Sequence, residues 1–274
     1  MSEPGLVGQR SLAGRSVALS VSDSADLGRL GLLPEHCRVA VAEVAQAVFL
    51  AGGQIVYGGN LDSTGFTGVL LDQALDFADA RGALLLVVPH SVHRDVDDDG
   101  LRVVQHRLGV TGRLVLLDPD GRPTPLALRD RGPWDPAASL TAMRHHVTAT
   151  TDARVIVGGK LRGHQGRLPG VVEEALASLR AGHPLFAAGG FGGAACAIAR
   201  WIGATDREFW PEGLPEGMTD AALDDAAREI SVLAANRAPT GLDAEQTSLL
   251  AATHRAGDIA SLVTLGAARA LGPA

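Results

Sequence analysis

The amino-acid sequence predicts an α/β protein in which helices cover both faces of a mainly parallel sheet. Short β-prone runs alternate with helical patterns, and the loops between them are short. Of the 274 residues, 46% are hydrophobic, 4% are aromatic and 34 are glycine. Three of the β-prone runs end directly in a Gly-Gly pair. This composition excludes collagen-like and disordered chains, and no run of 18 apolar residues predicts a membrane span.

The first third of the sequence predicts three strands separated by two helices. Pro34 suits the first turn of a helix, and apolar residues recur behind it at helical spacing until a Gly-Gly pair ends the pattern. The run 84–88 is apolar throughout, which is typical of a strand buried on both faces. The predicted strands are 16–21, 54–57 and 84–88, and the predicted helices are 34–51 and 68–80.

The middle of the chain is more polar. Residues 90–100 are polar, and we expect the run Asp97-Asp98-Asp99 within them to be a solvated loop. A short helix over 101–108, a strand over 114–117, a long surface connection over 118–136 and a helix over 137–150 follow.

The last strands predicted are 153–157 and 184–188, followed by helices over 169–180 and 194–202 respectively. After residue 204 the pattern is helical, over 219–235 and again over 243–271.

These patterns divide the chain into three parts. Residues 1–13 are a lead-in, 14–203 form the domain that contains the sheet, and 204–274 form a helical extension. We expect the extension to pack on the sheet domain or to form a subunit interface.

Charge and cysteine content narrow the classes of function. The chain has 24 Lys and Arg against 31 Asp and Glu, a net charge of −7, which argues against nucleic acid as a partner. Cys37 and Cys196, the two cysteines, lie on apolar helical faces and are predicted in the core. They imply no disulfide framework. The first residues lack the basic and apolar regions of a signal peptide, so we expect a cytoplasmic protein that does not bind membranes.

Glycine turns carry most of the functional information. Gly58-Gly59, Gly158-Gly159 and Gly189-Gly190 each follow a predicted strand, and Ser22-Asp23-Ser24 follows the first strand. Ligands of open α/β sheets bind at the carboxyl ends of the strands, where glycines let backbone N–H groups approach an anion. These turns therefore predict a pocket for a phosphate-bearing ligand at one sheet edge. The alternative is that the glycines only permit tight turns between strands and helices.

One turn also matches a dinucleotide fingerprint. Residues 190–195 fit the loose pattern G-x-G-x-x-A, but they follow one of the last strands, whereas that fingerprint belongs on the first. Hydride-transfer chemistry is therefore not favoured. The sequence also contains no P-loop and no G-x-S-x-G nucleophile elbow.

Four ordered segments together resemble the SLOG superfamily. They are 20–24, 51–59, 158–175 and 189–195, and the resemblance covers about 14–203. Within that superfamily, the chain looks most similar to the prokaryotic relatives of the N-terminal domain of TRPM channels. The LOG and DprA proteins are related members of the superfamily. The resemblance implies a Rossmann-like, doubly wound fold that senses a nucleotide or an NAD-derived signal, either ADP-ribose-like or cyclic. It also implies a bacterial defence role, with a TIR-type effector as partner, and we expect a homo-oligomer.

The resemblance also leaves an enzymatic alternative. LOG enzymes cleave the N-glycosidic bond of nucleoside monophosphates and carry the motif P-G-G-x-G-T-x-x-E. Here Gly170-Val171-Val172-Glu173-Glu174 matches its last five positions, with Glu173 or Glu174 as the acid. Val171 replaces the threonine, and Arg167-Leu168-Pro169 stands where P-G-G is expected. These departures favour a binding protein without a catalytic residue over a hydrolase.

The candidate ligand-binding residues lie in and around these turns. The expected anion cradle combines the surface turn Gly158-Gly159-Lys160 with Gly170 at a helix start. The full set is Ser22, Asp23, Ser24, Gly58, Gly59, Asn60, Asp62, Gly65, Phe66, Thr67, Gly158, Gly159, Lys160, Arg162, Gly166, Arg167, Pro169, Gly170, Glu174, Gly190, Phe191, Gly192 and Gly193.

For each side-chain type in this set, the sequence leaves open a role in ligand binding and a purely structural role. The cations either pair with phosphate or are solvated loop charges. Asp23 and Asp62 either accept ribose hydroxyls or cap turns. Phe66 and Phe191 either stack on a base or are buried under their loops. His90, His93 and Asp95, like the pair His145-His146, supply too few ligands for a metal, so neither a metal nor a further cofactor is expected.

Overall fold

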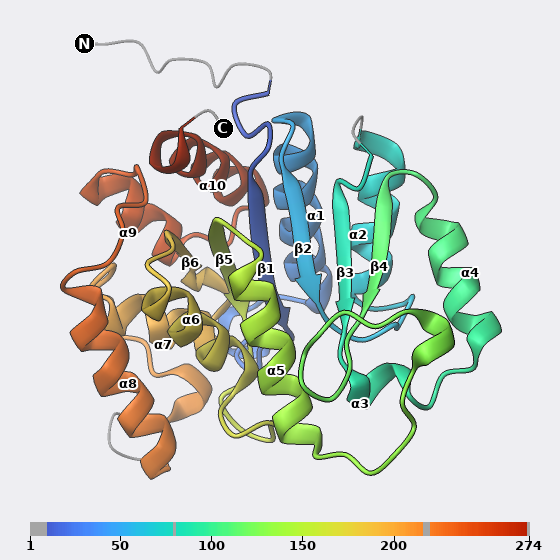
Figure 1. Cartoon of the computed structure of the whole chain (residues 1–274). Helices are drawn as coiled ribbons and strands as arrows, with labels where there is room; N and C mark the ends of the chain where they lie inside the picture. The colour runs from blue at the N-terminus through green and yellow to red at the C-terminus, as the bar shows by residue number, and fades with distance from the viewer. Residues whose placement is uncertain (1–9, 79–80, 216–219, 273–274) are drawn as a thin grey trace.

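A single six-stranded parallel sheet forms the centre of the computed structural model, which describes residues 10–78, 81–215 and 220–272 (Figure 1). The strand order is β4-β3-β2-β1-β5-β6, and every strand pair is parallel. The strands are β1 (Ser16–Ser22), β2 (Gln54–Gly58), β3 (Leu84–Val88), β4 (Gly112–Leu116), β5 (Ala153–Gly158) and β6 (Leu185–Ala188). This confirms the predicted Rossmann-like α/β fold with a helical C-terminal part.

Helices cover both faces of the sheet. They are α1 (Pro34–Leu50), α2 (Phe66–Phe77), α3 (His90–His93), α4 (Asp98–Leu108), α5 (Pro136–Ala149), α6 (Gly170–Arg180), α7 (Gly193–Trp201), α8 (Ala221–Ala234), α9 (Ala244–Ala252) and α10 (Ala256–Leu271). Side chains of a strand alternate between faces. Val17 and Leu19 of β1 therefore join the core formed with α1 and α10, whereas Ala18 joins the core formed with α5.

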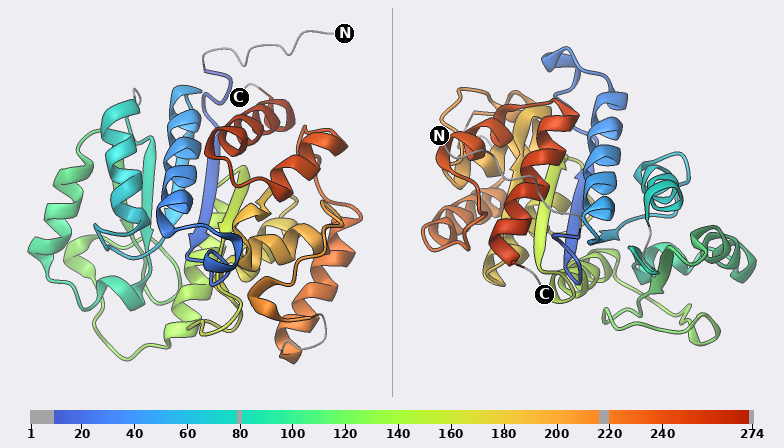
Figure 2. Two further views of the ribbon diagram at one scale, coloured as in Figure 1. Left: turned by 180° about the vertical axis from the view of Figure 1, so that it is seen from behind. Right: turned by 90° about the horizontal axis from the view of Figure 1, so that it is seen from above.

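The C-terminal helices pack on the sheet domain, which is one of the two arrangements expected from the sequence. Helices α1 and α10 lie side by side on one face (Figure 2), and α8 packs against α6 and α7 on the other. Gly266 of α10 lies so close to Phe186 of β6 that a Cβ there would be 2.6 Å from the phenyl ring. Within the described residues, no helix combines the length and the apolar character needed to cross a bilayer.

The strand order places a change of direction at β1. The chain adds β2, β3 and β4 on one side of β1 and then returns to add β5 and β6 on the other side. Ser22 is level with Gly158 in the register of β1 and β5, and Val157 is level with Ala188 in that of β5 and β6. The three Gly-Gly turns therefore share one edge, as predicted, and a crevice opens between the diverging loops.

The prediction of a solvated loop for the run Asp97-Asp98-Asp99 was wrong, because most of this polar stretch is helical. His90–His93 form the short helix α3, and Asp98 and Asp99 form the first turn of α4. The carboxylate of Asp97 accepts the N–H of Gly100 at 2.6 Å, so it caps the helix. Aspartate is favoured at this position because the first N–H groups of a helix have no backbone partner. Helix α2 also begins earlier than expected, at Phe66, and the last predicted residues of it lie outside the described ones.

Candidate functional site

A cleft of about 460 Å³ lies at the carboxyl edge of the sheet, where the chain changes direction around β1. Its walls come from the ends of β1 and β2, from the loop before α2, and from α5 and the start of α6. Of the predicted ligand-binding residues, eleven line it: Ser22, Asp23, Gly58, Gly59, Asn60, Asp62, Gly65, Phe66, Lys160, Gly170 and Glu174, the last of which is also the alternative catalytic acid.

Three cationic side chains line the cleft, and two of them, Arg38 and Lys160, are not paired with the acids of α6. Arg38 projects from the second turn of α1 and is 3.7 Å from the exposed carboxylate of Glu35. Lys160 follows β5 and is exposed, and among the described residues it makes no salt bridge. Both side chains are therefore available to a ligand anion, and Lys160 has no competing carboxylate.

Two helices open on the cleft without a side-chain cap. Gly65 and Phe66 at the start of α2, and Gly170 and Val171 at the start of α6, line the cavity, and neither helix is capped by a side chain of the described residues. Four helices that begin elsewhere are capped by aspartates, namely α4, α5, α8 and α9. Free N–H groups at a helix N-terminus attract anions, so the starts of α2 and α6 both offer backbone donors to an anion in the cleft.

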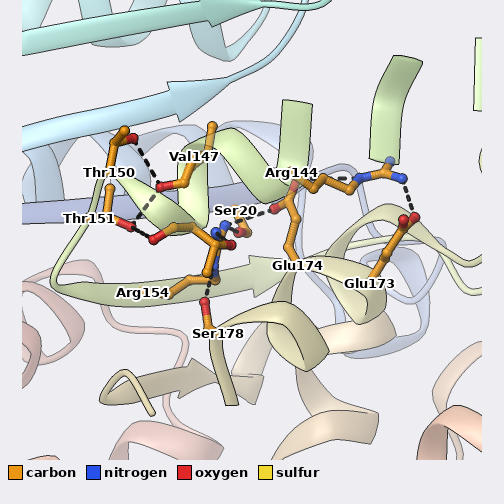
Figure 3. Close-up of polar contacts among 10 residues, drawn as sticks. Ser20, Arg144, Val147, Thr150, Thr151, Arg154, Glu173, Glu174 and Ser178 are labelled. Atoms are coloured by element: carbon orange, nitrogen blue, oxygen red, sulfur yellow. Dashed lines mark hydrogen bonds and ion pairs between the residues drawn. The ribbon is translucent and has the colours of Figure 1, made fainter. Parts of the chain in front are cut away.

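A buried polar network underlies the cleft (Figure 3). Arg154 of β5 is 1% exposed, and its guanidinium donates to Ser20 Oγ at 2.6 Å, to Ser178 Oγ at 2.6 Å and to Thr148 Oγ1 at 2.9 Å. Its Nη1 also lies 3.3 Å from Glu174 Oε2. Burial lowers the pKa of Arg154, and the neighbouring Glu174 carboxylate opposes that shift.

Arg144 of α5 joins both acids of α6. Its Nη1 is paired with Glu173 Oε2, and its Nε lies 3.7 Å from Glu174 Oε1. Glu173 also accepts a hydrogen bond from the Thr141 hydroxyl. Of the two acids considered from the sequence, Glu174 lines the cleft and Glu173 does not. Glu174 is held between two guanidinium groups, one on α5 and one on β5.

Tyr57 explains the need for glycine at the end of β2. A Cβ at Gly59 would lie 2.4 Å from the Tyr57 ring, so a side chain there would collide with the wall of the cleft. Burial raises the pKa of the Tyr57 hydroxyl, and the charge of Glu174 adds to this effect.

Gly158 and Gly159 lie behind the cleft wall rather than in an open surface turn, so the expected surface cradle is not what these glycines form. Both have left-handed backbone conformations, with φ of 60° and 93°. The N–H of Gly159 donates to Ser22 O, and its carbonyl accepts from Ala194 N, each at 2.9 Å. A Cβ at Gly159 would lie 2.8 Å from Val171. These backbone groups therefore join β1, β5 and α7.

The turn 190–193 is also packed inside the fold. Phe191 is fully buried in the core formed with α1, and a Cβ at Gly190 would lie 2.0 Å from Thr253 O. The Asp26 carboxylate accepts the N–H of Gly193 at 2.7 Å and that of Glu212 at 2.8 Å. The N-terminus of α7 is thus capped by an anion from the chain itself.

The other predicted residues have local roles. The hydroxyl of Thr67 donates to Asn60 O, Ser24 Oγ accepts the N–H of Asp26, and Asp62 accepts the N–H and hydroxyl of Thr64. These bonds to Thr64 lower the pKa of Asp62. Arg162, Gly166 and Pro169 do not line the cleft, and Arg167 lines a separate depression beside α5.

The sequence pattern did not indicate two arginines of the site, nor several of its apolar residues. Arg38, Tyr57, Met143 and Arg144 line the cleft from helical or strand positions that look ordinary in the sequence. Arg154 did carry a signal, because it interrupts an otherwise apolar strand. A buried charge in a strand requires polar partners, and those partners lead to Glu174.

The two cysteines and the histidines have structural surroundings in the described residues. Burial raises the pKa of the Cys37 thiol to about 12 and that of Cys196 to about 11. No group of three or more His, Cys, Asp or Glu side chains is arranged to hold a metal in this part of the chain. The Nε2 atoms of His90 and His93 lie 2.8 Å from the carbonyls of Asp130 and Leu117.

Comparison with known proteins gives one match. The model of the family described as SLOG cluster2 matches residues 11–228, which extends from before β1 into α8. No curated protein and no solved structure matches the chain.

Proposed function

The chain belongs to the SLOG cluster2 family, and from this membership and the geometry of the cleft we propose that it is a sensor of a nucleotide or NAD-derived signal. Family membership supports a nucleotide-binding, Rossmann-like domain. The observation that carries the proposal is the pair of uncapped helix N-termini, those of α2 and α6, that open on one cleft beside Lys160.

The cleft offers suitable groups for each part of a nucleotide. Phosphate oxygens would accept from the first N–H groups of α6, where Gly170 permits close approach, and would pair with Lys160. Asp23 and Glu174 would accept ribose hydroxyls, and Phe66 offers an aromatic face to a base. A volume of about 460 Å³ lies within the usual range for small-molecule sites.

Binding without turnover is favoured by the start of α6. Val171 replaces the threonine of the LOG motif and packs against Gly159, so this position offers the ligand no hydroxyl. Glu173 is occupied by Arg144 and Thr141. A bound signal would then act through a partner, for which a bacterial TIR-type effector is the candidate that the family suggests.

One observation favours a second function, a LOG-like hydrolase of a nucleotide N-glycosidic bond. Glu174 matches the acid of the LOG motif and lines the cleft beside Arg144. A carboxylate at this place could assist departure of a base or activate water.

The two functions separate on incubation of the full chain with AMP, NAD and ADP-ribose. A sensor binds one of them by calorimetry and leaves all three intact by chromatography. Steady release of base or nicotinamide that Glu174→Gln abolishes, while Glu229→Gln on the distant α8 retains it, would establish the hydrolase instead. Absence of binding to every nucleotide tested would refute both proposals.

A further inference from the structure

A second, larger cavity of about 920 Å³ runs along β4, the edge strand of the sheet. Its floor is apolar and includes Leu85 of β3, Leu101 of α4, Val115 of β4 and Leu126 of the following loop. None of these residues belongs to the cleft at the carboxyl edge. We call this cavity the β4 groove.

The backbone edge of β4 is already partly occupied. Leu114 N donates to Gln105 Oε1 at 3.0 Å, and Leu116 O accepts from Thr124 N at 2.8 Å. Addition of a strand from another chain requires free N–H and C=O groups along such an edge. The β4 groove is therefore better suited to the apolar body of a ligand than to a peptide backbone.

Within the part of the chain that the structure describes, the ionisable side chains that line the β4 groove are all basic. These residues are Arg102, His106, Arg113 and His146, in a chain whose net charge is −7. Arg102 is paired with Asp99 at 2.7 Å, whereas Arg113 is exposed on β4 and makes no salt bridge with the described residues. An apolar floor beside an unpaired guanidinium is complementary to an amphipathic anion.

We propose that the β4 groove is a second ligand site, which takes a small apolar carboxylate with its charged group on Arg113. The apolar body covers Leu85, Val115 and Leu126, and burial of this surface supplies most of the affinity. Its volume lies at the upper end of the range for small-molecule sites, which suits a medium-chain acyl or aromatic body.

The test uses the full chain and the fluorescent probe anilinonaphthalene sulfonate, an apolar anion. We expect octanoate to displace the probe and octylamine, its cationic analogue, to leave it bound. Arg113→Glu should weaken probe binding at least tenfold. Arg228→Glu, the same charge change at an exposed position on α8, should leave it unchanged. Leu126→Gln, which removes apolar floor without changing charge, should also weaken binding.

Three results would overturn the proposal. The first is probe binding by Arg113→Glu and Leu126→Gln that equals that of the parent. The second is loss of probe binding in Lys160→Glu alone, which would place the probe in the cleft. The third is a change of oligomeric state in either groove variant by sedimentation velocity, which would make the groove a contact between copies. Circular dichroism checks that each variant is folded. If Arg113→Glu is not folded, probe binding by Leu126→Gln tests the proposal.

Discussion

Among the side chains of the cleft, Lys160 is the one that we expect to pair directly with the phosphate of a ligand. It faces the cleft without a carboxylate partner in the described residues. Lys160→Ala should weaken nucleotide binding by about 1–3 kcal/mol, because a charge-assisted hydrogen bond is lost. Affinity of the parent should also fall with added salt, which screens this exposed contact. Titration calorimetry at two salt concentrations measures both effects.

Arg162→Ala is the matched control for Lys160→Ala. Arg162 is exposed, lies two residues further along the chain, and does not line the cleft. Its variant should bind like the parent. Equal losses in the two variants would indicate a diffuse charge effect instead of a contact at Lys160.

Two Arg–Glu ion pairs show how burial changes the contribution of such a pair to the free energy of unfolding. Arg154 and Glu174 are paired inside the fold, whereas Arg180 and Glu229 are paired at 2.7 Å on the surface. Arg154→Met should lower the free energy of unfolding by about 3–5 kcal/mol, because it removes a fully buried guanidinium from its hydroxyl partners and leaves the Glu174 carboxylate with one partner fewer. Arg180→Met should cost at most about 1 kcal/mol. Urea unfolding measures both, and similar losses would contradict the importance of burial.

The buried His93 predicts a pH dependence of stability. Burial lowers its pKa below the ordinary value of 6.5, so the unfolded chain takes up the proton first as pH falls. Its contribution to stability is therefore complete above about pH 6.5 and decreases as pH falls below that value. His93→Gln, which keeps a donor for Leu117 O, should reduce this loss between pH 7 and 5.5 in urea unfolding. The exposed His145→Gln should not reduce it.

At the scale of elements, close contact between the turn after β6 and the segment between α9 and α10 depends on Gly190. A Cβ there would lie 2.0 Å from Thr253 O, a backbone atom that cannot move without displacing the segment. Gly190→Ala should lower the free energy of unfolding by about 1–3 kcal/mol through overpacking. Gly28→Ala is the control, since nothing lies within 4 Å of its added Cβ. A thermal midpoint for Gly190→Ala equal to that of Gly28→Ala would refute this contact.

The capping pattern of the helices also belongs to this scale. Four helices that begin away from the cleft are capped by the aspartate directly before them, namely Asp97, Asp135, Asp220 and Asp243. Helix α7 is capped instead by Asp26, a residue distant in sequence. The starts of α2 and α6 have no such partner among the described side chains. Local sequence around residues 65 and 170 suggests this difference, but the capping of α7 by Asp26, 167 residues away, is not visible locally.

For the whole molecule, the C-terminal helices complete the core of the sheet domain. Ile259, Val263 and Ala267 of α10 are fully buried in the core that contains α1 and β1. A chain that ends after Arg237 would expose this face, so we expect it to aggregate or to lose cooperative unfolding. Size-exclusion chromatography and calorimetry check this, with the full chain expected to unfold in one transition. A monomeric truncated chain with the parent's thermal midpoint would contradict it.

By itself, the sequence determined the fold class, the strands and the edge of the sheet where the glycine turns meet. Alternating β runs and helical patterns are local signals of hydrophobic periodicity, and parallel strands then place their carboxyl ends together. The run Asp97-Asp98-Asp99 was misassigned because solvated aspartates and helix caps share the same local composition.

Only the tertiary structure decided which turns face the cleft. It places Gly58 and Gly170 on the wall but Gly159 and Phe191 inside the fold, although all four belong to similar glycine-rich segments. It also brings Arg38 and Arg144 to the cleft from separate helices. The physical reason is that contacts between residues far apart in sequence, such as Asp26 with Gly193, decide which backbone N–H groups remain available to a ligand. No local pattern encodes those contacts.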